Sequence, residues 1–188
     1  MKDLGGQIAY WDSVGATKTF THPVNPSRLS GVGPTARILD YGCGYGRVMG
    51  ELSERGFSDV SGVDLSPALI ERGRQMTPDL RFAVLESPPT VACAAASFDV
   101  VVLFAVLTCV PDDDAQRALV AELSRVLVPG GLLYVSDLLL QDDTRNQHRY
   151  SVHVQQFGTP TGSSRRTTVP CAGTTTWHTC VTCSPTST

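Results

Sequence analysis

Short runs of β-branched and other apolar residues alternate along the chain with longer stretches in which apolar positions recur at helical spacing. The short runs that predict strands are residues 37–41, 60–64, 80–85, 98–106 and 132–136. The longer stretches that predict helices are residues 47–56, 66–76 and 111–128. Strands that alternate with helices are typical of a parallel sheet covered by helices, so the pattern predicts an α/β fold.

Local signals support this order of elements. Residues 98–106 are apolar on both faces, as a buried central strand of such a sheet must be. Ser66 followed by Pro67 predicts an N-cap and a first-turn proline, and Gly56 predicts the end of the preceding helix. The first 36 residues are less regular and predict a cap with a short helix near residues 8–14.

Composition favours one domain with its own core. The chain has 188 residues, of which 41% are hydrophobic and 18% are charged. The longest apolar run, residues 100–107, has eight residues, against the ~20 that a membrane helix needs. The first residues lack the apolar stretch of a signal peptide, so we expect a cytoplasmic protein without a membrane span.

Charge favours a small-molecule partner. The formal net charge is −3, and the basic residues are scattered without forming a stripe. Residues 1–158 contain 13 of the 15 basic residues and all 18 acidic ones, a net charge of −5. This balance argues against nucleic acid as a partner.

The cysteines do not predict a metal site. Cys43, Cys93 and Cys109 are isolated, and such residues usually pack as small apolar groups. Cys180 and Cys183 have the CxxC spacing, but no second pair accompanies them and His178 is the one histidine nearby.

The composition changes abruptly near residue 158. In residues 159–188, eleven of thirty residues are Thr, and Leu, Ile, Phe, Asp, Glu and Lys are absent. One interpretation is a disordered tail. A one-base slip of the coding frame near residues 157–158 fits better, because reading the shifted frame permits an ordinary globular composition. The DNA across codons 155–165 distinguishes the two. We therefore divide the chain into a cap (1–36), an α/β domain (37–158) and an irregular Thr-rich tail (159–188).

A glycine loop between the first strand and its helix is the main candidate for ligand binding. It reads Asp40-Tyr41-Gly42-Cys43-Gly44-Tyr45-Gly46, an acidic residue followed by glycine at every second position. Glycines at the end of a strand let a ligand touch the main chain. A nicotinamide cofactor favours G-x-G-x-x-G, whereas this loop is G-x-G-x-G. The carboxylate before it would oppose a pyrophosphate and suit a positively charged ligand.

Two further carboxylates follow strands. Asp64 ends the second strand and can accept hydrogen bonds from both hydroxyls of a ribose, which implies a nucleoside. The alternative is that Asp64 only caps the next helix. Glu86 follows the third strand and can accept from an adenine amino group, or it is simply solvated surface.

Four segments together resemble the class I S-adenosylmethionine-dependent methyltransferases of the small-molecule type. They are Ile38-Leu39-Asp40-Tyr41-Gly42-Cys43-Gly44-Tyr45-Gly46, Val63-Asp64-Leu65-Ser66, Ser97-Phe98-Asp99-Val100-Val101 and Leu127-Val128-Pro129-Gly130-Gly131. The resemblance spans about residues 36–140. It implies a Rossmann-like, doubly wound and mostly parallel sheet of seven strands. The family's last two strands would follow residue 150, so we expect the C-terminal strands to be incomplete or aberrant.

The resemblance also implies a site for S-adenosylmethionine, with S-adenosylhomocysteine as the product. The methionine part would lie against the glycine loop, with Asp40, Gly42, Cys43, Gly44 and Gly46 as its residues. The ribose would bind Asp64, and the adenine would lie near Leu65 and Glu86, although the family more usually has Gly-Asp at the latter position. Phe104 would flank the sulfonium.

Methyl transfer is an in-line displacement, so the protein mainly aligns the reactants and excludes water. Asp137, at the end of the fifth strand, and His22, in the cap, are the candidate general bases. The alternatives are an anchor for a loop or helix at Asp137 and an exposed loop histidine at His22. Tyr10 and Trp11 either close over the cofactor or only pack the cap helix.

Other functions stay open at this point. The chain can be a binder of an adenosine cofactor that transfers no methyl group, either as an inactive or truncated methyltransferase or as a nicotinamide oxidoreductase. Oxygen, nitrogen and carbon acceptors are all compatible with the sequence, and so is a homodimer.

Overall fold

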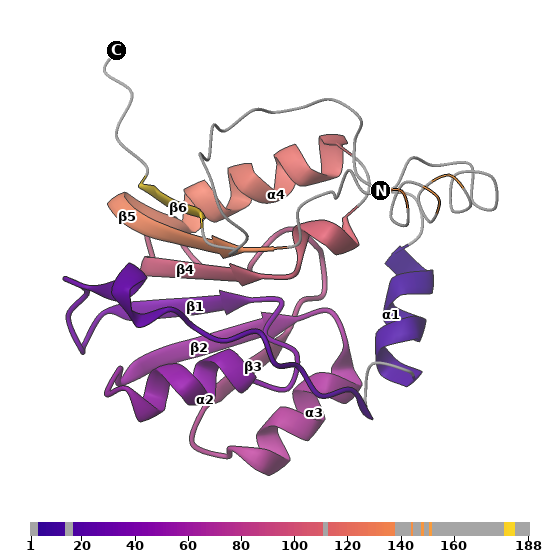
Figure 1. Ribbon diagram of the computed structural model, residues 1–188, viewed down its shortest axis with the longest axis horizontal. Coiled ribbons are helices and arrows are strands. Elements are labelled where there is room, and N and C mark those ends of the chain that lie inside the picture. Colours follow the sequence, from indigo (N-terminus) through magenta and orange to yellow (C-terminus); the bar gives the residue numbers. More distant parts are fainter. Residues whose placement is uncertain are drawn as a thin grey trace.

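A computed structural model describes residues 4–13, 17–110, 113–137 and 179–182, together with Thr144, His148 and Ser151. The helical elements are α1 (Leu4–Ser13), η2 (Pro26–Leu29), α2 (Arg47–Glu54), α3 (Pro67–Met76), η3 (Leu107–Cys109) and α4 (Asp113–Val126). The strands are β1 (Arg37–Tyr41), β2 (Asp59–Asp64), β3 (Arg81–Val84), β4 (Phe98–Phe104), β5 (Leu127–Ser136) and β6 (Thr179–Thr182). Figure 1 shows their arrangement.

The strands form one sheet in the order β3-β2-β1-β4-β5-β6. The first five strands along the chain are parallel, and β6 pairs antiparallel with β5. The strand order reverses between β1 and β4, which are neighbours at the centre of the sheet. Ligands of doubly wound folds bind at such a reversal, at the carboxyl ends of the strands. The predicted Rossmann-like, doubly wound and mostly parallel sheet is confirmed.

Alternation along the strands divides the core between the two faces of the sheet. Ile38 of β1 and Val100 of β4 pack with the buried residues of α2, including Met49 and Leu52. Their neighbours Leu39 and Val101 point to the other face and pack with α4. Figure 1 shows α2 and α3 on one side of the sheet and α4 on the other. Because both faces are covered, the central strands are mostly apolar, and β1 and β4 contain one aspartate each, Asp40 and Asp99.

The junction between α4 and β5 differs from the predicted one. The sequence predicts a break at residues 129–131, whereas the structure begins β5 at Leu127, directly after α4. The β4–β5 register shifts between Phe98 and Val100, so a bulge accommodates the extra residues. Gly130 adopts a φ of +78°, and a Cβ on Gly131 would lie 2.9 Å from the carbonyl oxygen of Val128. The two glycines therefore let this strand bend without being broken.

One part of the predicted irregular tail forms a strand. Residues 179–182, which read Thr-Cys-Val-Thr, are β6, and they pair with residues 132–135 of β5. β-branched residues suit such a position, so a high threonine content is compatible with a strand. The proposed change of reading frame near residue 158, and Cys183 and His178 of the CxxC segment, lie outside the described residues.

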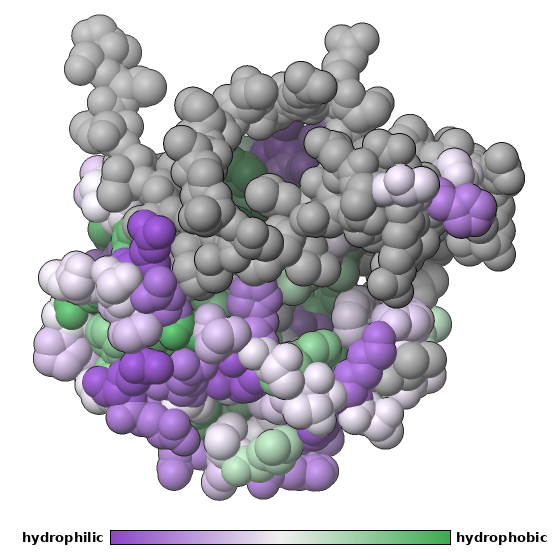
Figure 2. All heavy atoms as spheres, in the orientation of Figure 1, coloured by the Kyte–Doolittle hydropathy of each residue, from purple (hydrophilic) through white to green (hydrophobic). Residues whose placement is uncertain are grey.

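The visible surface of the described residues is largely hydrophilic (Figure 2). In Figure 2, hydrophilic residues cover much of the lower part of the visible face, with small hydrophobic areas between them. None of the helices that the structure describes has the length and hydrophobicity of a membrane span. The described residues also contain no cluster of three or more potential metal ligands.

Candidate active site

A cavity of about 410 Å³ lies at the carboxyl ends of β1, β2 and β4. Its lining comes from three parts of the chain: the strand ends with the loops that follow them, the start of α2, and the N-terminal cap. The cap residues include Trp11, Phe20 and His22. These segments are far apart in the sequence, and the fold brings them together around this cavity.

The glycine loop connects β1 to α2 and forms one wall of the cavity. Gly42 and Gly44 line it and adopt φ values of +78° and +55°. The N–H groups of Gly42 and Cys43 donate to the carbonyl oxygen of Val63, at 2.8 and 3.0 Å, and so fasten the loop to β2. A Cβ on Gly42 would lie 2.5 Å from Cγ2 of Val106. Glycine is therefore required both by conformation and by space.

Gly46 has a different position from the other two glycines. It is the N-cap of α2, with a φ of +82°, and it does not line the cavity. A Cβ there would lie 2.5 Å from Cζ of Phe82, because the loop packs closely against β3 at this point. The third glycine of the motif thus lets the helix begin close to the sheet.

Asp64 caps the next helix and also lines the cavity, so its predicted contact with a ribose stays a prediction. Its Oδ1 accepts from the N–H of Ser66 at 2.9 Å, and its Oδ2 accepts from the N–H of Gly44 at 2.8 Å. The carboxylate therefore joins the start of α3 to the glycine loop, and it also lines the cavity. Burial raises its pKa, whereas the backbone N–H donors act in the opposite direction.

Asp40 is the least satisfied carboxylate of the site. Its side chain is buried, and within the described part of the chain Oδ2 has no hydrogen-bond partner. Burial raises the pKa of Asp40 to about 7, although the positive charge of Arg47 lowers it. A buried oxygen without a partner is costly, and a cationic donor in the cavity would remove that cost. Asp40 and Asp64 therefore suit a ligand that carries an ammonium group and hydroxyls, as S-adenosylmethionine does.

The remaining predicted cofactor residues divide into two groups. Leu65, Cys43 and Phe104 line the cavity. Burial raises the pKa of the Cys43 thiol well above its ordinary value, so this cysteine is a packing residue and not a thiolate. Glu86 is exposed and does not contribute to the cavity lining, which agrees with the solvated-surface alternative.

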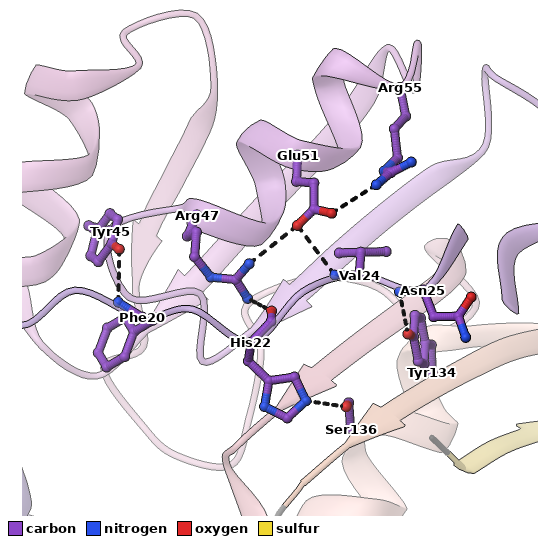
Figure 3. Close-up of polar contacts among 10 residues, drawn as sticks. All are labelled: Phe20, His22, Val24, Asn25, Tyr45, Arg47, Glu51, Arg55, Tyr134 and Ser136. Atoms are coloured by element: carbon purple, nitrogen blue, oxygen red, sulfur yellow. Dashed lines mark hydrogen bonds and ion pairs between the residues drawn. The ribbon is translucent and has the colours of Figure 1, made fainter. Parts of the chain in front are cut away.

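Residues 20–25, which we call the strap, cross above the strand ends and bring His22 into the cavity (Figure 3). The hydroxyl oxygens of Tyr45 and Tyr134 accept from the N–H groups of Phe20 and Asn25, at 3.1 and 3.0 Å. Arg47 donates to the carbonyl oxygen of His22. Side chains from both sides thus fix the backbone of the strap. His22 is half-buried, unlike the exposed loop histidine of the alternative interpretation.

Asp137 has the contacts of a loop anchor. Its Oδ2 accepts from the N–H of Leu107 at 2.6 Å, and the N–H of Thr108 lies 3.3 Å from both carboxylate oxygens. Asp137 thereby holds η3, the turn after β4, and it is outside the cavity lining. These contacts support the anchoring role over that of a general base.

The cap helix α1 is fastened to α3 by a residue that the sequence did not single out. Asp12 accepts a hydrogen bond from the hydroxyl of Ser66 and another from the N–H of Ala68, at 3.2 Å. The neighbouring Trp11 lines the cavity, and its ring centroid lies 6.1 Å from that of Phe20. Tyr10, in contrast, is 42% exposed. Of the two aromatic residues that could close over the cofactor, Trp11 is therefore the one that lies at the cavity.

The comparisons with known proteins agree with this geometry. A family model described as a methyltransferase domain matches residues 39–135. The chain is 32% identical over 138 residues to a ubiquinone biosynthesis O-methyltransferase of Xanthomonas oryzae pv. oryzae, covering 69% of this chain and 56% of that protein. It therefore spans just over half the length of the curated relatives it matches.

Solved structures show the same fold. A structure of a SAM-dependent methyltransferase from Methanosarcina mazei matches with a TM-score of 0.66 and 27% identity, over 70% of this chain and 66% of that one. The cyclase SpnF matches in fold, with a TM-score of 0.55 and 20% identity, over 63% of this chain and 44% of that one.

The sheet order, the glycine loop at its reversal and the two buried carboxylates agree with the family match over residues 39–135. This chain belongs to the class I S-adenosylmethionine-dependent methyltransferases.

Proposed function

We propose that the protein transfers a methyl group from S-adenosylmethionine to a small-molecule acceptor by in-line displacement. One observation carries the proposal: the cavity at the reversal of strand order contains two buried carboxylates beside a glycine loop, and one oxygen of Asp40 lacks a partner within the described residues. This is an arrangement for a cationic nucleoside and not for a pyrophosphate.

The cavity residues would divide the cofactor between them. Asp40 would bind the ammonium group, with the main chain of Gly42 and Gly44 beside the methionine part. Asp64 would accept from the ribose hydroxyls, and Leu65 would lie against the adenine. Phe104, at the end of β4, would flank the sulfonium.

The bound cofactor supplies an electrophilic methyl group, so no covalent protein nucleophile is required. The protein's own contribution is orientation and exclusion of water. Trp11 and Phe20 form an apolar cover on the cap side of the cavity. The strap holds Phe20 relative to the strand ends, because its backbone is hydrogen-bonded to Tyr45, Arg47 and Tyr134.

An oxygen acceptor is the more specific proposal. The relatives that the chain matches at 28 to 33% identity are named O-methyltransferases. The net charge of −3 and the scattered basic residues favour a small acceptor over a polyanion. A cytoplasmic location and a homodimer stay predictions from the sequence.

Titration calorimetry with S-adenosylmethionine, S-adenosylhomocysteine and NAD(H) tests the cofactor. We expect the two sulfur nucleosides to bind and NAD(H) not to bind. Methyl transfer from labelled cofactor to a panel of small hydroxyl compounds then tests the reaction. Binding without transfer to any acceptor would favour the alternative of a cofactor binder.

Asp64→Ala tests the assignment of the ribose. Loss of hydrogen bonds to a charged group is expected to weaken cofactor binding by ~1.5–3 kcal/mol. Asp59→Ala is the matched control, because Asp59 begins the same strand and contacts Arg81 outside the cavity. Unchanged affinity in a folded Asp64→Ala protein would contradict the assignment.

A further inference from the structure

His22 has one ring nitrogen engaged in a well-defined contact. Its Nε2 lies 2.6 Å from Oγ of Ser136, a buried residue at the end of β5 (Figure 3). The imidazole also lies beside the ring of Phe104, with 5.4 Å between the centroids. Within the described part of the chain, Nδ1 forms no hydrogen bond. The ring is thus held by Ser136 and Phe104, and His22 is one of the residues that line the cavity.

The tautomer of the ring decides which nitrogen can accept a proton, because a serine hydroxyl can accept from Nε2–H or donate to an unprotonated Nε2. When Nε2–H donates to the serine oxygen, the lone pair of a neutral imidazole is on Nδ1. This tautomer needs no rearrangement before proton transfer.

Resting on the proposed methyl transfer, we propose that His22 is the catalytic residue that takes the proton of an acceptor hydroxyl on Nδ1. Ser136 is then a positioning residue that holds the Nε2–H tautomer. In this step the acceptor O–H bond breaks and its proton goes to Nδ1. An electron pair of the oxygen forms the new O–C bond, and the pair of the broken C–S bond returns to sulfur. The products are an ether, a neutral thioether and an imidazolium.

The positive charge of Arg47 near His22 suits a hydroxyl acceptor. Burial lowers the pKa of His22, and the positive charge of Arg47 lowers it further, whereas Asp137 acts in the opposite direction. Arg47 lines the same cavity, and Glu51 balances part of its charge at 3.3 Å. A guanidinium in the lining of the same cavity can stabilise an oxygen that becomes negative as its proton leaves.

Nitrogen NMR of the histidine rings tests the positioning role without turnover. The ¹⁵N shifts of His22 should show the Nε2–H tautomer in the wild-type complex with S-adenosylhomocysteine. Ser136→Ala should give a mixture of tautomers, and Ser136→Thr should restore the wild-type form. A protonated Nδ1 in the wild-type protein would overturn the proposal, as would a Ser136→Ala spectrum identical to it.

Turnover of para-substituted phenols of increasing acidity tests the catalytic role. His22→Gln should lower kcat by roughly 10²- to 10⁴-fold for the least acidic phenol. The loss should shrink as acidity rises, because an ionised phenol needs no base. His148→Gln is the matched control, since His148 is exposed. A loss independent of acidity, no loss, or no methylation of any phenol by wild-type protein would overturn the proposal.

Binding of S-adenosylhomocysteine, measured on the same samples, distinguishes a failure of the cofactor site from a failure of the proposed general base. If the wild-type protein fails to bind it, the proposed function itself is wrong. If binding is normal in His22→Gln but the NMR or kinetic expectation fails, the assignment of His22 and Ser136 is wrong and the cofactor site stands.

Discussion

Asp40 makes the cavity sensitive to pH. Its pKa is raised from 3.8 to about 7 by burial, so the folded state holds a proton that the unfolded state has released over this range. The free energy of unfolding therefore falls as pH rises from about 4 to about 7. Above about pH 7 Asp40 is ionised in both states, so it adds no further pH dependence. If Asp40 acted alone, this pKa shift would lower the free energy of unfolding by about 4 kcal/mol between these pH values.

Cofactor binding should reverse this effect. An ammonium beside Asp40 favours the ionised carboxylate, so binding releases a proton below about pH 7. We expect the affinity for S-adenosylhomocysteine to rise from pH 5 to 7 and then to level. Calorimetry in two buffers of different ionisation enthalpy measures the proton released.

Asp40→Asn is the control for this prediction, because asparagine has a similar shape and does not ionise. Asp64 also has a raised pKa and remains in the variant. The difference between the two proteins therefore isolates Asp40. A variant with the wild-type pH dependence would show that another group is responsible.

The positive φ angles of the glycine loop give a second prediction at the level of single residues. Gly42→Ala combines an unfavourable backbone angle, about 1–2 kcal/mol, with a clash against Val106 that adds about 1–3 kcal/mol. Because Val106 lines the cavity, its displacement should also weaken cofactor binding. Chemical denaturation and calorimetry measure the two losses.

Gly56→Ala separates strain from crowding. Gly56 also has a positive φ, +94°, but a Cβ there would have no neighbour within 4 Å. This variant should lose stability through strain alone and should bind the cofactor normally. Equal losses of stability and affinity in both variants would refute the role given to Val106.

Among the secondary-structure elements, the attachment of α1 to α3 controls how the cavity is covered. Asp12 accepts from Ser66 and Ala68 at the start of α3, and Trp11 beside it lines the cavity. Asp12→Ala should free this end of α1 and raise the dissociation rate of S-adenosylhomocysteine by about 5- to 20-fold, equivalent to losing one or two net hydrogen bonds. Stopped-flow Trp fluorescence measures that rate.

Ser13→Ala is the comparison for Asp12→Ala. Ser13 is in the same helix, but its hydroxyl donates to the carbonyl oxygen of Ala9, at 2.7 Å, within α1 itself. Its loss should leave the dissociation rate unchanged. If both variants dissociate at the wild-type rate, α1 does not limit release of the product.

The sequence predicted elements better than it predicted contacts. Strands β1 to β4 were located to within about two residues, because turn residues and apolar runs are local signals. The junction of α4 and β5 was missed, since a bulge at Gly130 and Gly131 depends on pairing with β4.

The same distinction applies to the site. The motif located Asp40, Asp64 and the glycines, which lie within 25 residues of one another. The partners Asp12 and Ser136 were missed because they contact Ser66 and His22 across 54 and 114 residues of sequence. Arg47 was also missed, although its position as the first residue of α2, directly after the glycine loop, could have indicated that it lies at the cavity.

At the scale of the whole molecule, β6 decides whether the sheet has an unpaired edge at β5. Residues 132–135 of β5 pair with residues 179–182, so removal of everything after residue 158 would expose this edge. We expect faster hydrogen exchange at residues 132–135 in the truncated chain, measured by mass spectrometry. Residues 100–103 of β4 should be unaffected, because they pair with β1 and β5 in both proteins.

Equal exchange at β5 in the full and truncated chains would mean that β6 contributes nothing to the sheet in solution. That outcome would favour the proposed frame slip near residue 158, and a chain with the frame restored should then protect β5 more strongly than either. Faster exchange on truncation would instead show that a threonine-rich segment serves as an edge strand, because pairing with β5 requires backbone N–H and C=O groups and β-compatible side chains, not an apolar face.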